Sequence, residues 1–185
     1  MKIAVYCSSR SNVNPDFIHS AQIIGNNIGL LNATLIYGGM DFGLMKIVAL
    51  SAKSSGGRIV GVVPRTHISQ QLEFNDETVI AEDLSDRKSK IMAMSDLFIV
   101  LPGGYGTLYE FFTTLAHLSF TNDNSKTIII LNRNNFYDQT LLQLQVMIDN
   151  AMMNPDVMQR IKVVTTVEEC CNIVMQQHKY LNSVK

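Results

Sequence analysis

Short apolar runs rich in β-branched residues recur along this chain and alternate with longer segments whose apolar residues repeat with helical period. The apolar runs predict strands at residues 2–7, 33–38, 58–64, 96–102, 127–132 and 161–166. Between them the period predicts helices at residues 15–31, 43–54, 85–95, 106–120, 138–152 and 167–180. The strand runs are apolar nearly throughout, which is typical of parallel strands that helices cover on both faces. The alternation predicts an α/β fold built on an open, mostly parallel sheet.

The composition limits the size of the molecule and the kinds of partner. A chain of 185 residues with 46% apolar residues is long enough for one core, so we expect a single domain over residues 1–185. Fifteen basic against sixteen acidic residues provide no global positive field, which disfavours nucleic-acid or membrane partners. No apolar stretch approaches the roughly 18 residues of a membrane span. The three cysteines form no even disulfide framework, so we expect a soluble, cytoplasmic protein.

All eleven glycines lie at or before Gly106, and most of them cluster where a predicted strand ends. In open α/β sheets, ligands bind beyond the carboxyl ends of strands, at the point where the strand order reverses. The first half of the chain is therefore expected to build the site and the second half to build scaffold. Residues 67–82 form the longest stretch without a clear period, and we expect them to be a flap near the site or a subunit contact.

The segment PGGYGT, residues 102–107, leads from a predicted strand into a predicted helix. Its backbone amides and the positive helix end suit a phosphate, although a tight turn needing glycine only for positive φ would have the same letters. Two alternatives also exist for Glu110. Thr107 and Glu110 have the T-x-x-E spacing of a capping box, as Thr166 and Glu169 do, but Glu110 is equally available for chemistry.

Two further segments are candidates for the site. The segment YGGMDFGLMK, residues 37–46, is a second glycine-rich turn that either encloses the other side of a ligand or serves only helix packing. At the end of the first predicted strand, Ser8, Ser9 and Arg10 add hydroxyl groups and a cation. In the predicted helix near residue 85, Ser85 or Asp86 is the expected cap, yet Arg87, Lys88 and Lys90 crowd its first turn. The helix dipole disfavours cations there, and a bound anion would offset this cost, whereas the alternative is a solvated turn.

The motifs YGGMDFGLM, GGRIVGVVP, DRKSKIM, SDLFIVLPGGYGTLYE and LNRNNFYD resemble those of the LONELY GUY proteins, from Lys2 to about Glu169. The resemblance implies a Rossmann-like fold, a homodimer and an enzyme without metal or cofactor. Such proteins hydrolyse the N-glycosidic bond of a cytokinin riboside 5′-monophosphate, and some bacterial relatives accept AMP, releasing the free base and ribose 5-phosphate. A decarboxylase of amino acids would instead need pyridoxal phosphate on a lysine.

By resemblance, Arg87 and Glu110 are the expected catalytic residues. The expected phosphate- and substrate-binding residues are Ser8, Gly38, Gly39, Lys88, Gly103, Gly104, Tyr105, Gly106 and Thr107. The chain also departs from the family pattern. Leu84-Ser85 replaces Met-His, Tyr109 replaces a second glutamate, Met40 replaces a third glycine, and AHLSFT from Ala116 replaces TWxQLG. These departures surround the side of the site where the base is expected.

Cleavage of a nucleotide N-glycosidic bond builds positive charge on the anomeric carbon, so a carboxylate near the ribose is required. Glu110 is expected to orient the attacking water or to hold the ribose hydroxyls, while Arg87 fixes the phosphate or polarises the leaving base. The alternative function is a non-catalytic carrier of a nucleotide or a phosphorylated cofactor. A carrier would bind its ligand tightly and release no base.

Overall fold

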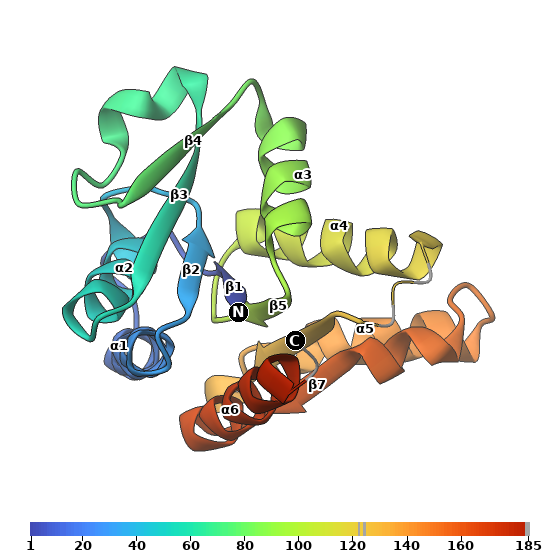
Figure 1. The fold of residues 1–185 in the computed structure, drawn as a ribbon. Helices are drawn as coiled ribbons and strands as arrows, with labels where there is room; N and C mark the ends of the chain where they lie inside the picture. The colour runs from blue at the N-terminus through green and yellow to red at the C-terminus, as the bar shows by residue number, and fades with distance from the viewer. Residues whose placement is uncertain (122, 124, 184–185) are drawn as a thin grey trace.

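The computed structural model describes residues 1–121, 123 and 125–183, so the last two residues of the predicted 1–185 domain lie outside the described part. Seven parallel strands form one sheet in the order β4-β3-β2-β1-β5-β6-β7 (Figure 1). The strands are β1 (Lys2–Tyr6), β2 (Thr34–Tyr37), β3 (Arg58–Pro64), β4 (Glu77–Ala81), β5 (Leu97–Val100), β6 (Thr127–Leu131) and β7 (Ile161–Val164). The chain therefore has the predicted α/β, Rossmann-like fold.

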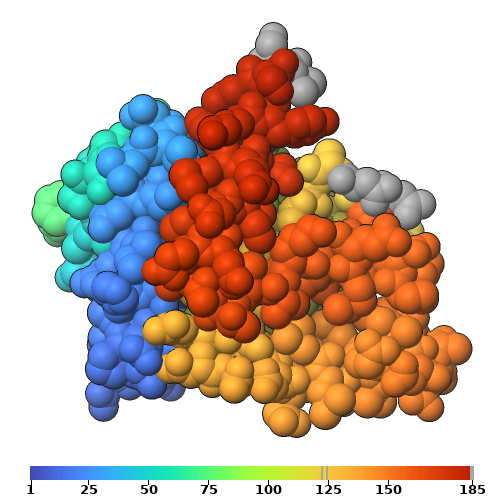
Figure 2. Space-filling model, turned by 90° about the horizontal axis from the view of Figure 1, so that it is seen from below, coloured from blue at the N-terminus to red at the C-terminus, as the bar shows by residue number. Residues whose placement is uncertain are grey.

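Helices cover both faces of this sheet, as the apolar strands predict. They are α1 (Pro15–Leu30), α2 (Gly43–Ser54), α3 (Leu84–Met94), α4 (Tyr105–Thr121), α5 (Asp138–Asp149) and α6 (Val167–Ser183). Alternate residues of β1 divide the core: Ile3 and Val5 pack with α1, α2 and α6, whereas Ala4 and Tyr6 pack with α3, α4 and α5. Figure 2 shows α6, in red, lying against the blue N-terminal segment that includes α1.

Strand order reverses at β1, which pairs with β2 on one side and with β5 on the other. The chain winds outward first through β2, β3 and β4, then returns to add β5, β6 and β7 on the opposite edge. The loops that follow β1 and β5 therefore leave the sheet in diverging directions and open a space at its carboxyl edge. Within the described part of the chain, no helix has the length and apolar character needed to cross a membrane.

The prediction of an irregular flap at residues 67–82 is wrong in part. Residues 77–81 form β4, an edge strand that pairs in parallel with β3 from Val60↔Glu77 to Pro64↔Ala81. A short 3₁₀ helix, Arg65–Gln70, precedes it. The run ETVIA is only half-buried because it lies at the sheet edge. The polar residues beside it interrupt the apolar pattern by which the other strands were predicted. The amide of Leu72 donates to the carbonyl of Gly39, which ties this segment to the turn after β2.

The helix caps agree with the sequence prediction at α6 and differ from it at α3. Asn14 caps α1, and Thr166 with Glu169 forms a capping box at α6. At α3 the cap is Asp83, whose carboxylate accepts the amide of Asp86, and not Ser85 or Asp86 as predicted. Asp86 instead accepts the amide of Glu82, so the two carboxylates close the turn reciprocally.

Two glycines of α1 allow it to contact α2 at backbone distance. A Cβ at Gly25 would overlap the carbonyl oxygen of Val48 and would lie 2.7 Å from the Cβ of Ser51. We expect Gly25→Ala to lower the free energy of unfolding by about 1–3 kcal/mol, since overpacking forces the helices apart. Urea unfolding measures this loss. Gln22→Ala, at an exposed position of the same helix, is the control, and equal stability of the two variants would contradict the packing argument.

Candidate active site

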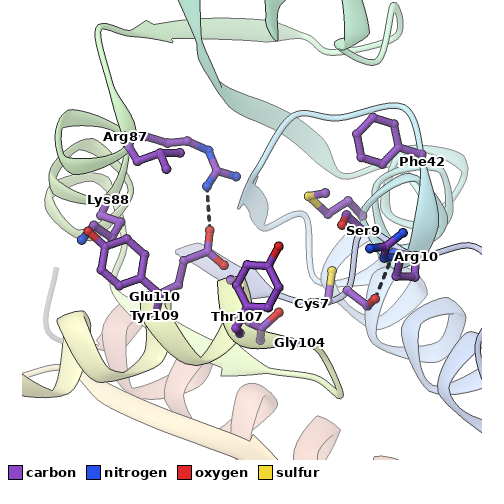
Figure 3. A pocket seen from close by; sticks show the side chains of 15 residues that line it. Cys7, Ser9, Arg10, Phe42, Arg87, Lys88, Gly104, Thr107, Tyr109 and Glu110 are labelled. Carbon is purple, nitrogen blue, oxygen red and sulfur yellow. Dashed lines mark hydrogen bonds and ion pairs between the residues drawn. The ribbon is translucent and has the colours of Figure 1, made fainter. Parts of the chain in front are cut away.

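A cavity of about 430 Å³ lies at the carboxyl ends of β1 and β5, where the strand order reverses. Four segments form its wall. They are residues 7–10 after β1, the start of α2 with Phe42 and Met45, the first turn of α3 with Leu84, Arg87 and Lys88, and the start of α4 from Gly104 to Glu110. Figure 3 shows the side chains of these segments converging from different parts of the sheet edge.

An ion pair joins two walls of this cavity. Nη1 of Arg87 donates to Oε1 of Glu110 at 2.7 Å, and the two side chains are only 13% and 12% exposed. The Nε of Arg87 donates to the carbonyl of Val62 at the end of β3, 2.9 Å away. Gly38 gives the guanidinium room, because a Cβ there would overlap its Nη2. Arg87 therefore connects α3, β3 and α4, and it holds the carboxylate in one orientation.

Burial governs the ionisation of Glu110. Desolvation raises the pKa of its carboxyl group above the ordinary value, and the positive charges of Arg87 and Lys88 offset part of this rise. Burial raises the pKa of the Cys7 thiol far above its usual range, which makes this cysteine a poor nucleophile. Among the described side chains that line the cavity, Glu110 is the one carboxylate.

The capping-box interpretation of Thr107 and Glu110 is wrong. Helix α4 begins at Tyr105, and the carbonyl of Gly104 accepts the amide of Leu108 at its first turn. Glu110 therefore lies in the second turn, and its carboxylate is turned to Arg87 and not back to the helix start. The first amides of α4 receive no glutamate cap, which leaves amides at the helix start, as at any uncapped end, available to an anion.

The glycines of the PGGYGT segment have different tasks. A Cβ at Gly103 would overlap the buried Thr107 side chain, so Gly103 permits the tight turn from β5 into α4. A Cβ at Gly104 or Gly106 would meet no atom within 4 Å, and neither residue has a positive φ. These two glycines line the cavity and present bare backbone to it. The fold does not require them, whereas close approach of a ligand would.

The segment after β1 forms the opposite wall. Oγ of Ser8 accepts the amide of Arg10 at 3.0 Å, and the carbonyl of Ser8 accepts the amide of Leu44. Gly43, with a φ of +61°, allows α2 to approach the backbone of Ser9 closely. The turn is therefore fixed by backbone contacts, and its exposed Arg10 side chain lines the cavity. Among the residues that the structure describes, Arg10 makes no ion pair.

Lys88 occupies the deepest position among the cations. Its side chain is buried, and its Nζ donates to Oγ1 of Thr113 at 3.2 Å. The Nζ also lies 3.4 Å from the ring centroid of Tyr109, which is a cation–π contact. With Arg10 and Arg87, three cationic side chains line the cavity against the carboxylate of Glu110. The cavity is therefore positive although the whole chain carries a formal charge of −1.

Most of the predicted site residues meet in this cavity. Its wall includes Ser8, Arg87, Lys88, Gly104, Tyr105, Gly106, Thr107 and Glu110. Gly38, Gly39 and Gly103 lie outside the wall: Gly38 makes room for Arg87, and Gly39, with a φ of +75°, packs against Val63. Arg10, Phe42 and Tyr109 also line the wall and are not among the expected binding residues, although Arg10 closely follows the first strand and Tyr109 is one of the departures expected near the base. Within the described residues, no group of three metal-ligating side chains occurs.

The sequence pattern of the family described as "possible lysine decarboxylase" matches residues 45–174. The chain is also 31% identical over 172 residues to a cytokinin riboside 5′-monophosphate phosphoribohydrolase of Arabidopsis thaliana, covering 91% of this chain and 79% of that protein. The chain belongs to the LONELY GUY family. A relative of the same name from Mycobacterium tuberculosis is 31% identical over 169 residues, which cover 90% and 89% of the two chains.

Solved structures share the fold of this LONELY GUY chain at lower identity. The molybdenum cofactor binding protein of Rippkaea orientalis matches with a TM-score of 0.73 and 20% identity, over 95% of each chain. The molybdenum cofactor carrier protein of Chlamydomonas reinhardtii matches with a TM-score of 0.74 and 19% identity, over 95% of this chain and 96% of that one. At this identity the likeness extends to the fold alone.

The Arg87–Glu110 pair predicts a specific pH dependence of stability. Since the pKa of Glu110 is higher in the folded chain than in the unfolded one, its ionisation lowers the free energy of unfolding as pH rises from about 4.3 through the folded pKa. Arg87→Met removes the opposing charge and raises that pKa further. We expect the decline to grow larger and to extend to higher pH in this variant. Urea unfolding across a pH series, with carboxyl titration by carbon NMR, measures both effects.

The control for this experiment is Arg65→Met. Arg65 pairs with Glu82 on the exposed surface, where the pair lowers the pKa of that carboxyl group. Its loss changes stability in the acid range below the ordinary carboxyl pKa, the opposite side from the Glu110 window. Indistinguishable pH profiles for Arg87→Met and Arg65→Met would contradict the role given to Arg87.

Proposed function

We propose that this protein is a nucleoside 5′-monophosphate phosphoribohydrolase, which cleaves the N-glycosidic bond of an adenine-type nucleotide to free base and ribose 5-phosphate. The observation that carries the proposal is that Glu110 and the start of its own helix, Gly104 to Thr107, line the same cavity. Glu110 lies five positions after Tyr105, a rise of about 7.5 Å along a helix axis. A ribose 5-phosphate likewise holds its phosphate and its anomeric carbon a few bonds apart.

In the proposed complex the phosphate binds at the start of α4, and the anomeric carbon lies near Glu110. The carboxylate orients a water molecule and stabilises the positive charge that develops as the bond to the base breaks. The water supplies a hydroxyl group to the anomeric carbon, and its proton leaves through Glu110. The base departs with the electron pair of the broken bond and takes up a proton.

Arg87 is a positioning residue in this mechanism. Its guanidinium already donates to both the carboxylate of Glu110 and the carbonyl of Val62, so it orients the carboxylate and favours its ionised form. It is unsuited to donate a proton because the pKa of arginine exceeds about 12. The positive excess among the wall residues supports a phosphate dianion as the bound group, in preference to an unphosphorylated nucleoside. Homodimer formation and a cytoplasmic location stay predictions.

The reaction is tested directly with AMP and isopentenyladenosine 5′-monophosphate as substrates. We expect wild-type protein to release the free base and ribose 5-phosphate in equal amounts. Glu110→Gln keeps the shape of the side chain but removes its charge, and we expect it to reduce kcat about a hundredfold or more. Liquid chromatography of the base and an enzymatic assay of ribose 5-phosphate measure both products.

Glu77→Gln is the matched control, since Glu77 is an exposed carboxylate at the start of β4, outside the cavity wall. It should turn over at the wild-type rate. Undiminished release of base by Glu110→Gln would contradict the catalytic assignment of that residue. Tight binding of the nucleotide by calorimetry, with no base released by wild type, would support the carrier alternative instead.

The phosphate position is tested by adding a methyl group to the bare backbone at the start of α4. Gly104→Ala and Gly106→Ala put a Cβ into open space without a positive φ, so we expect thermal unfolding to stay within a few degrees of wild type. The same methyl groups prevent close approach of the phosphate to the amides. We expect KM for AMP to rise at least about tenfold, since charge-assisted hydrogen bonds to the phosphate are each worth roughly 1.5–3 kcal/mol. An unchanged KM in both variants would place the phosphate elsewhere.

A further inference from the structure

The contact between Lys88 and Tyr109 has no role in the proposed mechanism. Lys88 is a buried ammonium group whose neighbours, among the described residues, are the hydroxyl of Thr113 and the face of the Tyr109 ring. A buried cation without a carboxylate partner is costly, so the ring supplies part of its compensation. Because Tyr109 and Thr113 are four residues apart on α4, they lie on the same face of that helix and receive Lys88 together.

The same contact fixes the ring of Tyr109 at the cavity wall. The ammonium group of Lys88 covers one face of the ring, and the residue is still 48% exposed and lines the cavity. The ring therefore stays accessible while its position is held from behind. Figure 3 shows Lys88 and Tyr109 on one side of Glu110, and Cys7 and Arg10 on the other side.

This arrangement gives the cavity a direction. The start of α4 and the segment after β1 lie on one side of Glu110, and the Tyr109 ring lies on the other. In the proposed complex the phosphate binds at the start of α4 and the anomeric carbon lies at Glu110. The base of that nucleotide then extends to the side where Tyr109 lies. The base then meets an aromatic ring that is already ordered.

We propose that Tyr109 is the residue that selects the leaving base, with Lys88 holding its ring as a stacking platform for a purine. The inference rests on the proposed function, because it assumes that a nucleotide enters this cavity. A purine overlaps a phenol ring over a larger area than a pyrimidine does, so the platform favours AMP over CMP and UMP. The cation behind the ring withdraws electron density and strengthens stacking against an electron-rich base.

Two other aromatic side chains line the cavity and serve this role less well. Tyr105 is 88% exposed at the first residue of α4, so stacking on its ring would first have to immobilise it. Phe42 lies on the far side of Glu110 from Lys88 and packs against the core beneath α2. Tyr109 directly precedes Glu110 on α4, and the ammonium group of Lys88 fixes its ring.

The test compares Tyr109→Leu, which removes the ring, with Tyr109→Phe, which keeps it. We expect Tyr109→Leu to raise KM for AMP about tenfold or more, since stacking of a base on an aromatic side chain is worth about that much, and to change kcat less. Tyr109→Phe should keep most of the affinity. The preference for AMP over CMP should collapse in Tyr109→Leu alone. Tyr180→Leu, at an exposed tyrosine of α6 away from the cavity, is the matched control.

A second variant tests the platform itself. Lys88 lowers the pKa of the Tyr109 phenol below its ordinary value. Lys88→Met keeps most of the length of the side chain but removes its charge. We expect one tyrosine to titrate at higher pH in this variant, which the absorbance of phenolate reports. Stacking on the ring lowers the absorbance of bound adenine, and this decrease should be smaller in the variant. These spectroscopic changes separate a platform from a residue that only supports the fold.

The outcomes separate this inference from the proposed function. Turnover with equal KM values for wild type and Tyr109→Leu would overturn the inference and leave the function standing. Binding of AMP that requires the ring, with no release of base, would overturn the function and keep the platform. A rise in KM for Tyr105→Leu alone would move the base to the cavity mouth and overturn the inference. Absence of both binding and turnover would overturn both proposals.

Discussion

The buried ion pair between Arg87 and Glu110 is the interaction on which the rest of the site depends. A carboxylate at this depth would otherwise be protonated or unfavourable, because burial raises its pKa. Arg87 offsets the cost, but only because Gly38 leaves space for the guanidinium and Val62 accepts its Nε. Removing one partner of such a buried pair typically costs about 3–5 kcal/mol. The segments that carry Arg87, Gly38 and Val62 therefore together constrain one carboxylate.

The strand order explains why these segments meet. Reversal at β1 places the ends of β1 and β5 beside an open space, and β2 and β3 deliver Gly38 and Val62 to the same edge. In the described part of the chain, no residue beyond Glu110 lines the cavity. The strands β6 and β7, with α5 and α6, complete the sheet and bury its other half. The concentration of glycines before residue 107 is the sequence sign of this division.

The sequence predicted elements better than partners, and one spacing illustrates the reason. T-x-x-E occurs at Thr107–Glu110 and at Thr166–Glu169, yet only the second pair forms a capping box. The difference is Arg87, 23 residues before Glu110, which competes for the carboxylate through the fold and not through local sequence. Edge strand β4 was missed for a related reason: a half-buried run lacks the continuous apolar pattern of the central strands. The roles of Gly38 and Tyr109 likewise depend on contacts with Arg87 and Lys88 of α3, which are distant from them in the sequence.

Arg87 and Lys88 are adjacent in sequence, and α3 directs them to different partners. Arg87 reaches the carboxylate of Glu110, whereas Lys88 reaches the ring of Tyr109 and the hydroxyl of Thr113. This separation matters most when the cavity holds a phosphate dianion. An added negative charge near Glu110 would raise the pKa of its carboxyl group further and favour the protonated, inactive form. The positive charges of Lys88 and Arg10 oppose that rise, so in the proposed complex the cations that attract the substrate also keep the catalytic carboxylate ionised.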